Sequence, residues 1–436
     1  MLLTRRPEAS HAAAIPAPSP STWRRYGWAL ALAGALTAGA VLRLAWAGDM
    51  EYKLDERWMF EQTQAGGIAT SEPWTGMPAS IGCNGPGMSV WVFVALAWLC
   101  EVNDPPALVR IVEVLNVGAL LLHVVLAWRF VPRADREPWY WSAALLAVNP
   151  LAVLYHRKIW PPSVLPVFVV VMLMCWFRRE RRGAAFGWGL IGAILGQIHM
   201  GGFHFAAGLA LWTRLFDRQR IAWRSWFVGS ALGALPLLPW LAYLVRTHGQ
   251  RPPMPLKWGH LFEAKFWIHW VREPFGIGID HPLGEDFGDF LSQPRWHDHP
   301  TWLVAALHIA AVVAGVYVVA IACRRRRTGC GWRWITDPAP TALVQNAVLW
   351  GYGMLLTLSL VPIHRHYQII ALPIEMLWVA RLTLGTNVEA AGSRRTGRAL
   401  LAGLCLIQLA ISASFLSYVH SKQEICGEYG TAYGAQ

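Results

Sequence analysis

The sequence predicts an all-α polytopic membrane protein with about eleven transmembrane helices, in a range of about nine to thirteen, and two long extracytoplasmic loops. Three observations predict this class. Apolar runs of roughly 20 residues, enough to cross about 30 Å of hydrocarbon, recur along the chain. The chain is 55% hydrophobic and 15% charged, whereas a soluble domain carries about 25% charged residues. Its 26 tryptophans suit helices that meet the headgroup layer many times.

The net charge of +12 does not predict a nucleic-acid partner. Lys and Arg fall in short clusters between apolar runs, so the clusters at 129–133, 178–182 and 214–220 are expected on the cytoplasmic side. The apolar segment 88–101 has about 14 residues, which is marginal for a crossing, and a crossing there would place 129–133 outside. We therefore expect 88–101 to be an interfacial or re-entrant helix inside one outer loop, 48–106.

The alternation of apolar runs and basic clusters divides the chain into four parts. These are a disordered cytoplasmic tail at 1–25, a catalytic transmembrane module at 26–245 that includes the outer loop 48–106, an extracytoplasmic loop at 246–300 and a C-terminal transmembrane module at 301–436. The expected spans are 26–47, 107–128, 139–155, 164–177, a hairpin of two at 184–213, 226–245, 301–323, 341–361, 368–384 and 399–419.

An acidic stretch follows the first span, where the chain meets water. Asp and Glu number 26 in 436 residues, yet five fall between Asp49 and Glu61, with only Lys53 and Arg57 as basic neighbours. The stretch is either a solvated loop or a reaction centre. A carboxylate that is partly desolvated at the boundary has a raised pKa and suits general-base chemistry, and we expect Asp55, with Glu56 beside it, to act there.

Two cationic turns are expected on the outer face, against the usual positive-inside trend. One is His156-Arg157-Lys158, and the other is His364-Arg365-His366, with Arg157, Lys158, His364 and Arg365 as the expected ligands. They either anchor span ends or bind an anion such as a lipid phosphate. Gln197 and His199 flank a tight outer hairpin, where they either cap a helix end or contact the sugar or the headgroup. The spacing of His and carboxylates in the outer loop 280–299 fits no metal motif, so no metal and no cofactor are predicted.

These residues together resemble the C-type glycosyltransferases that use a polyprenyl-phosphate sugar, such as the protein O-mannosyltransferases and the lipid A aminoarabinose transferase. The matching residues are Arg43 with Asp55-Glu56, the apolar stretch 88–101 followed by Arg110, Asn149-Pro150 with Tyr155 and Arg157, and Gln197 with His199. The resemblance covers roughly residues 26–215. The family's second carboxylate after the third span is absent, because the turn reads Trp160-Pro161-Pro162-Ser163; Glu56 or an acid of the loop 280–298 would take its role.

The resemblance implies inverting transfer of a sugar from a polyprenyl-phosphate donor to an acceptor hydroxyl on a lipid, glycan or protein. Asp55 would deprotonate the acceptor, and Arg157, Lys158 and Arg365 would bind the donor phosphate. The composition favours a bacterial plasma (inner) membrane, with the active site facing the periplasm or the exterior. Two alternatives remain: a transporter or flippase of a lipid-linked or anionic solute, and a ligase or polymerase that uses lipid-diphosphate donors.

Overall fold

The computed structural model describes residues 22–64, 74–78, 84–247, 260–327, 335–385 and 391–435. Within them the chain is a bundle of α-helices with three small two-stranded antiparallel sheets, β1–β2, β3–β4 and β5–β6. Residues 1–21 of the predicted tail lie outside the described residues, and its last four residues, 22–25, belong to α1, which begins at Thr22. The helical class predicted from the sequence is therefore confirmed, with the small sheets as an addition.

A helix or a broken helix occupies each segment that the sequence predicts to span the membrane. These are α1 (Thr22–Leu44), α4 (Pro105–Arg129), α5 (Arg136–Val148) with α6 (Pro150–Tyr155), α7 (Leu165–Trp176), α8 (Arg182–Ile198), α9 (Gly201–Phe216), α10 (Trp223–Ala234) with α11 (Leu238–Arg246), α15 (Leu303–Arg327), α16 (Pro340–Asn346) with α17 (Gly353–Thr357), α18 (Leu372–Leu384) and α19 (Ala391–Lys422).

Among the described residues, four helices have the length and apolarity to cross a bilayer. They are Pro105–Arg129, Trp223–Arg246, Leu303–Arg324 and Arg394–Lys422. A chain with several such helices is a multi-pass membrane protein. The number of eleven crossings stays a prediction, because the other helices are shorter or interrupted.

The interruption between α5 and α6 shows how the bundle tolerates broken helices. Pro150 cannot continue the hydrogen-bond ladder of α5, and Asn149 begins α6 by accepting a hydrogen bond from Ala152 N at 3.0 Å. The Asn149 amide donates to Glu273 O and to Gln408 Oε1, both at 2.9 Å. Unsatisfied polar groups are costly away from water. The hydrogen bonds of this buried side chain reduce that cost at the break between the two helices.

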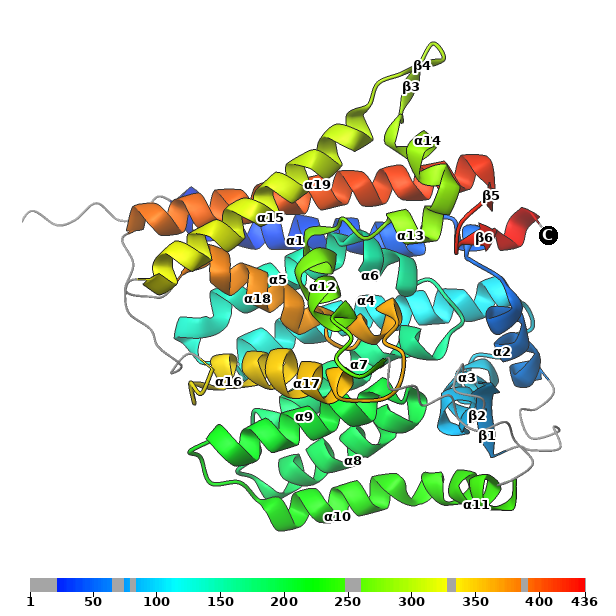
Figure 1. Cartoon of the computed structure of the whole chain (residues 1–436), viewed down its shortest axis with the longest axis vertical. Coiled ribbons are helices and arrows are strands. Elements are labelled where there is room, and N and C mark those ends of the chain that lie inside the picture. The colour runs from blue at the N-terminus through cyan, green and yellow to red at the C-terminus, as the bar shows by residue number, and fades with distance from the viewer. Residues whose placement is uncertain are drawn as a thin grey trace, which may run out of the picture.

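The predicted outer loop 48–106, which carries the acidic stretch and is called the reaction loop below, lies at one end of the bundle (Figure 1). It contains α2 (Leu54–Gln64), β1 (Thr75–Pro78), β2 (Asn84–Pro86) and α3 (Met88–Leu99). Helix α3 packs on α2, β1 and α8, and its 12 residues are too few to cross a bilayer as a regular helix. Its predicted interfacial position stays a prediction.

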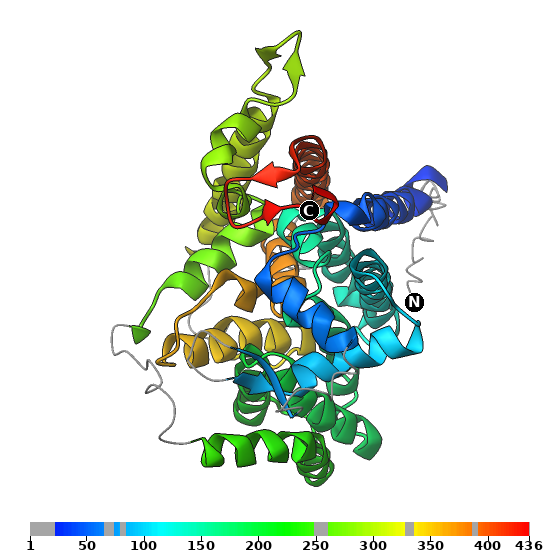
Figure 2. The same cartoon turned by 90° about the vertical axis from the view of Figure 1, so that its right-hand side faces the viewer.

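The second predicted outer loop and the C-terminal segment come to the same end of the bundle, which faces the viewer in Figure 2. The loop contains α12 (Lys265–Arg272), α13 (Asp280–Leu283), α14 (Phe287–Leu291), β3 (Arg295–Trp296) and β4 (His299–Pro300). The C-terminal strands are β5 (Glu424–Ile425) and β6 (Gly430–Thr431). Tyr433 N donates to Met50 O at 3.0 Å, so the last residues of the chain lie against the start of the reaction loop.

Close helix packing depends on small residues, and this generates the first prediction. A Cβ on Gly208 of α9 would lie 2.5 Å from Tyr352 N, whereas a Cβ on Gly118 of α4 would meet nothing within 4 Å. We expect Gly208→Val to destabilise the protein by about 2 kcal/mol or more, since overpacking against backbone is not relieved by rotamer changes. Gly118→Val is the control. Thermal unfolding of both variants in detergent checks this, and equal midpoints would contradict it.

Candidate active site

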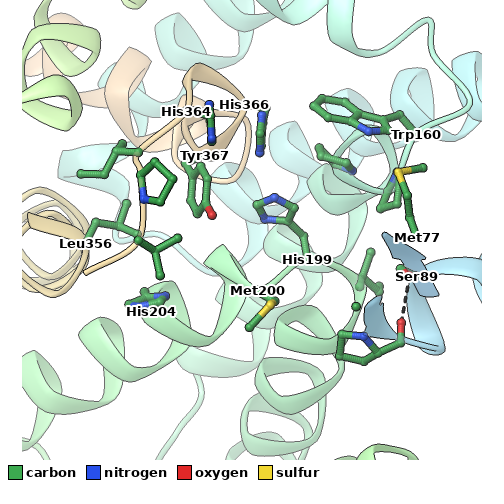
Figure 3. Close-up of a pocket in the computed structure, with 18 of the residues that line it drawn as sticks. Met77, Ser89, Trp160, His199, Met200, His204, Leu356, His364, His366 and Tyr367 are labelled. Carbon is green, nitrogen blue, oxygen red and sulfur yellow. Dashed lines mark hydrogen bonds between the residues drawn. The ribbon is translucent and has the colours of Figure 1, made fainter. Parts of the chain in front are cut away.

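A cavity of about 300 Å³ lies at the end of the bundle that carries α2 and the β1–β2 hairpin, a volume at the lower end of the range for small-molecule sites. Five parts of the chain line it: Asp55 of α2, the β1–β2 hairpin with Ser89, the turn at 160–162, and two segments that carry histidines, 198–204 and 356–367. In Figure 3 the side chains of His199, His364, His366 and Tyr367 gather around it from these last two segments.

Asp55 is exposed at the cavity. It lies in the first turn of α2, and it accepts a hydrogen bond from the Trp160 side chain. Partial burial, and next the neighbouring charge of Glu56, raise the pKa of Asp55 above 3.8. Among the described lining residues it is the only carboxylate.

Glu56 points away from the cavity into a buried ion cluster. Its carboxylate lies 3.2 Å from Lys158 Nζ and accepts a hydrogen bond from Lys53 N at 3.1 Å. Lys158 Nζ also lies 2.7 Å from Glu51 Oε2. The contact with Lys53 N is half of a capping box, in which the third helical residue reaches back to the residue before the helix. Glu56 therefore caps the N-terminal end of α2 and joins this helix to Lys158.

Lys158 is enclosed by partners. Its side chain is 8% exposed, and its ammonium group lies 4.8 Å from the ring centroid of Trp160. Although burial opposes the charge, the carboxylates of Glu51 and Glu56 raise the pKa of Lys158. Burial is the largest influence on Glu51 and raises its pKa above 4.5. The cluster is thus an ion triplet in which one lysine compensates two buried carboxylates.

Arg157 is also bound to internal partners. It donates to Ala45 O at 2.6 Å and to Trp46 O at 2.8 Å, and its Nε lies 3.4 Å from Glu113 Oε1. These carbonyls end the first membrane helix. Arg157, which the sequence analysis predicts to bind a phosphate, therefore caps the C-terminal end of α1 in the structure.

Arg43, which the resemblance matched to the family signature, is fully buried. It donates to His156 Nδ1 at 3.0 Å and to the carbonyls of Ala147 at 2.6 Å and Leu146 at 3.1 Å. These bonds join α1 to the end of α5. The structure thus gives Arg43 a scaffolding position behind the ion cluster.

Arg365 and Gln197 are likewise directed into the protein. Arg365 Nε lies 3.2 Å from Glu273 Oε1, and Arg365 donates to Gly278 O. Gln197 is fully buried and donates to Ala193 O at 3.0 Å and Gly233 O at 2.7 Å, which joins α8 to α10. Neither side chain is among the residues that line the cavity.

His199 and His364 do line the cavity, together with His366 of the same predicted turn and with Tyr367, which the sequence analysis did not select. The ring centroids of His199 and His366 lie 5.1 Å apart, and those of His364 and His366 lie 5.5 Å apart. Burial lowers the pKa of His199 to about 4, and burial together with the neighbouring imidazoles lowers that of His366 well below 6.5. Both rings are therefore neutral at pH 7.

Trp160 connects the two halves of the site. Its ring lies 4.8 Å from that of His366 and 5.9 Å from that of Tyr155. In the sequence, the turn at 160–163 was noted only because it lacks the family's second carboxylate. The His and Tyr residues of 364–367 were the sequence signal for the histidine wall of the cavity. Within the part of the chain that the structure describes, no group of three His, Cys, Asp or Glu has the arrangement of a metal site.

Comparison with known proteins places this architecture. No family model and no curated protein matches the sequence. The crystal structure of ArnT from Cupriavidus metallidurans bound to undecaprenyl phosphate matches with a TM-score of 0.51 and 12% identity, over 91% of this chain and 78% of that chain. The chain therefore has the fold of the C-type glycosyltransferases.

Other solved structures with this fold are also similar. The apo Archaeoglobus fulgidus oligosaccharyltransferase has a TM-score of 0.43 and 13% identity, over 90% of this chain and 57% of that chain. Arabinofuranosyltransferase AftD from Mycobacteria has a TM-score of 0.41 and 17% identity, over 92% of this chain and 27% of that chain. This chain thus spans little more than half of the archaeal protein and about a quarter of the mycobacterial one.

The ion cluster generates a stability prediction. Lys158→Met leaves Glu51 and Glu56 without their shared cation, and removal of one partner of a buried ion pair costs about 3–5 kcal/mol. The pKa of Glu51, already raised, should rise further. A raised folded-state pKa makes stability fall as pH rises, so we expect the loss to be larger at pH 8 than at pH 5.

The control is Lys53→Met, because Lys53 contacts the same Glu51 at 2.7 Å but is 36% exposed. Exposed pairs contribute about 1 kcal/mol or less. Thermal unfolding of both variants at the two pH values checks the prediction. A loss for Lys158→Met that does not depend on pH, or an equal loss for Lys53→Met, would contradict it.

Proposed function

We propose that this protein is an integral-membrane glycosyltransferase that moves a sugar from a polyprenyl-phosphate donor to an acceptor hydroxyl on the extracytoplasmic face. The observation that carries the proposal is the position of Asp55 in a cavity at the outer end of a C-type glycosyltransferase fold. ArnT, which shares this fold, was crystallised with undecaprenyl phosphate. We assign the chain to a bacterial inner membrane, with the cavity facing the periplasm or the exterior.

Asp55 is the proposed base. As the acceptor oxygen bonds to the anomeric carbon, its proton passes to the Asp55 carboxylate. The bond between that carbon and the phosphate oxygen breaks, and the electron pair leaves with the lipid phosphate. Attack from the side opposite the phosphate inverts the anomeric carbon. A raised pKa brings Asp55 closer to the working pH, which makes a carboxylate a better base.

The other predicted residues divide into two groups by position. His199 and His364 face the cavity, and we propose contacts from them to the sugar or the phosphate. Arg157, Lys158, Arg365 and Gln197 bind carboxylates or carbonyls of the protein itself. We propose that these four hold the walls of the site, and that Glu56 positions α2. Direct contacts from them to the donor stay predictions of the resemblance.

The first test of the function compares Asp55→Asn with Glu61→Gln. Glu61 is an exposed carboxylate on the same helix and does not line the cavity. With polyprenyl-phosphate sugars and purified protein in nanodiscs, we expect Asp55→Asn to lower release of polyprenyl phosphate by roughly 10²–10⁴-fold, the usual contribution of a general base. Glu61→Gln should keep wild-type turnover.

Wild-type turnover by Asp55→Asn would remove the assigned base. If wild type binds the donor but releases no lipid phosphate with any acceptor, while counterflow of intact donor occurs in proteoliposomes, the transporter alternative would hold in place of the enzyme.

The pH profile gives an independent test. Because the pKa of Asp55 is raised above 3.8, the active carboxylate form is lost as pH falls through that raised value. We expect the wild-type rate to decline on the acid side of the profile, and the residual rate of Asp55→Asn to lack this decline. Single-turnover rates between pH 4 and pH 8 measure it. The same acid limb in both proteins would contradict the assignment.

A further inference from the structure

None of the described residues that line the cavity is Lys or Arg. The cations predicted for phosphate binding are paired inside the protein: Arg157 with Glu113, Lys158 with Glu51 and Glu56, and Arg365 with Glu273. To reach a ligand, each would have to leave a buried carboxylate unpaired, which is costly. A phosphate that enters the cavity therefore meets a different set of donors.

The available donors are imidazoles. His199, His364 and His366 line one wall of the cavity (Figure 3). The ring centroid of His366 lies 5.1 Å from that of His199 and 5.5 Å from that of His364. Among the described residues, the only hydrogen bond of these rings is that from Gly201 N to His199 Nδ1 at 3.3 Å. Each neutral ring has one N–H that can donate to an anion in the cavity; in His199 it is on Nε2, because Nδ1 accepts the hydrogen bond from Gly201 N.

We propose that His199, His364 and His366 form the subsite for the phosphate of the lipid carrier, and that this subsite takes up a proton when the phosphodiester of the donor becomes the phosphate monoester of the product. The proposal rests on the proposed function. A diester carries one negative charge, whereas a monoester at neutral pH carries nearly two, since its second pKa is about 6. The additional charge appears as the bond to the sugar breaks.

The proton and charge balance follows from these groups. The acceptor proton goes to Asp55, and the electron pair of the broken bond goes to the phosphate oxygen. The proton that the imidazoles take up comes from water. Neutral rings suit the monoanionic donor, because they donate hydrogen bonds without the cost of a buried cation. An imidazolium suits the dianionic product, because a bond between two ions is stronger than one between neutral groups.

The surrounding charges are consistent with this switch. The pKa values of His199, His364 and His366 are lowered by burial first and then by neighbouring positive groups. An anion in the cavity opposes both influences, so these pKa values rise when it binds. The titratable groups that face the three rings are Asp55, His204 and Tyr367 around the cavity, Lys158 in the ion cluster near His366, and His260, Glu263 and Lys265 beside His364.

The test measures proton uptake on binding and does not need turnover. Farnesyl phosphate, a monoester, and its methyl diester are titrated into the full-length protein in nanodiscs by calorimetry at pH 7.5. Two buffers of different ionisation enthalpy give the number of protons taken up. We expect the wild type to take up about half a proton or more with the monoester, and close to none with the diester.

The variants are His366→Gln and His364→Gln, with His299→Gln as the control. His299 is an exposed histidine in β4, away from the cavity lining. We expect the two cavity variants to bind the monoester roughly tenfold more weakly and with less proton uptake, the size expected for one lost hydrogen bond to a charged group. The control should match wild type. Thermal unfolding midpoints identify any variant that has lost its fold, and the other cavity variant then carries the test.

Inorganic phosphate separates recognition of the phosphate from binding of the lipid tail. Weaker binding with the same proton uptake supports a phosphate subsite. Monoester binding without proton uptake, or unchanged affinity in both cavity variants, overturns the proposal. The two proposals fail separately: proton-linked binding without any turnover would contradict the transferase, whereas turnover with proton-neutral product binding would contradict only the histidine subsite.

Discussion

The ammonium group of Lys158, held between the carboxylates of Glu51 and Glu56, is the contact on which the outer end of the molecule depends. It joins the chain that leaves the first membrane helix, the start of α2 and the turn after α6. Glu56 is committed to this cluster, and successive helical residues point about 100° apart. Asp55 is therefore turned out of the cluster and toward the cavity. The position of a carboxylate at the cavity thus follows from the burial of its neighbour.

The arginines of this region support the backbone, whereas the commonest polar side chains among the described ones that line the cavity are imidazoles, set among proline and aliphatic residues. Arg43 and Arg157 bind the carbonyls of Ala147 and Ala45, where membrane helices end. Carbonyl groups at helix ends need donors when water is excluded, and guanidinium groups supply several donors each. Arg43 and Arg157, which the sequence motif marks as functional, therefore use their hydrogen-bond donors on the ends of the helices that carry the site.

The C-terminal segment adds a second support to the same loop. His420 Nδ1 lies 2.7 Å from Asp49 Oδ2, and the His420 ring stacks on Trp46 at 4.3 Å. Ala432 forms a β-bridge with Glu51, which also contacts Lys158. The segment that follows α1 and the C-terminal segment therefore meet beside the ion cluster. This arrangement restricts the loop that presents Asp55, although the loop lies outside the helical bundle.

The sequence by itself determined the helical membrane class and the position of the acidic stretch after the first span, because apolar length and local charge are properties of short segments. It also selected His199 and His364, which line the cavity. It did not separate Asp55 from Glu56, nor cavity-facing cations from structural ones. Those distinctions depend on which side chains find partners across more than a hundred residues, as Lys158 does with Glu51. Only the tertiary structure brings such groups together, and the cost of burying an unpaired charge decides which of them stay available to a substrate.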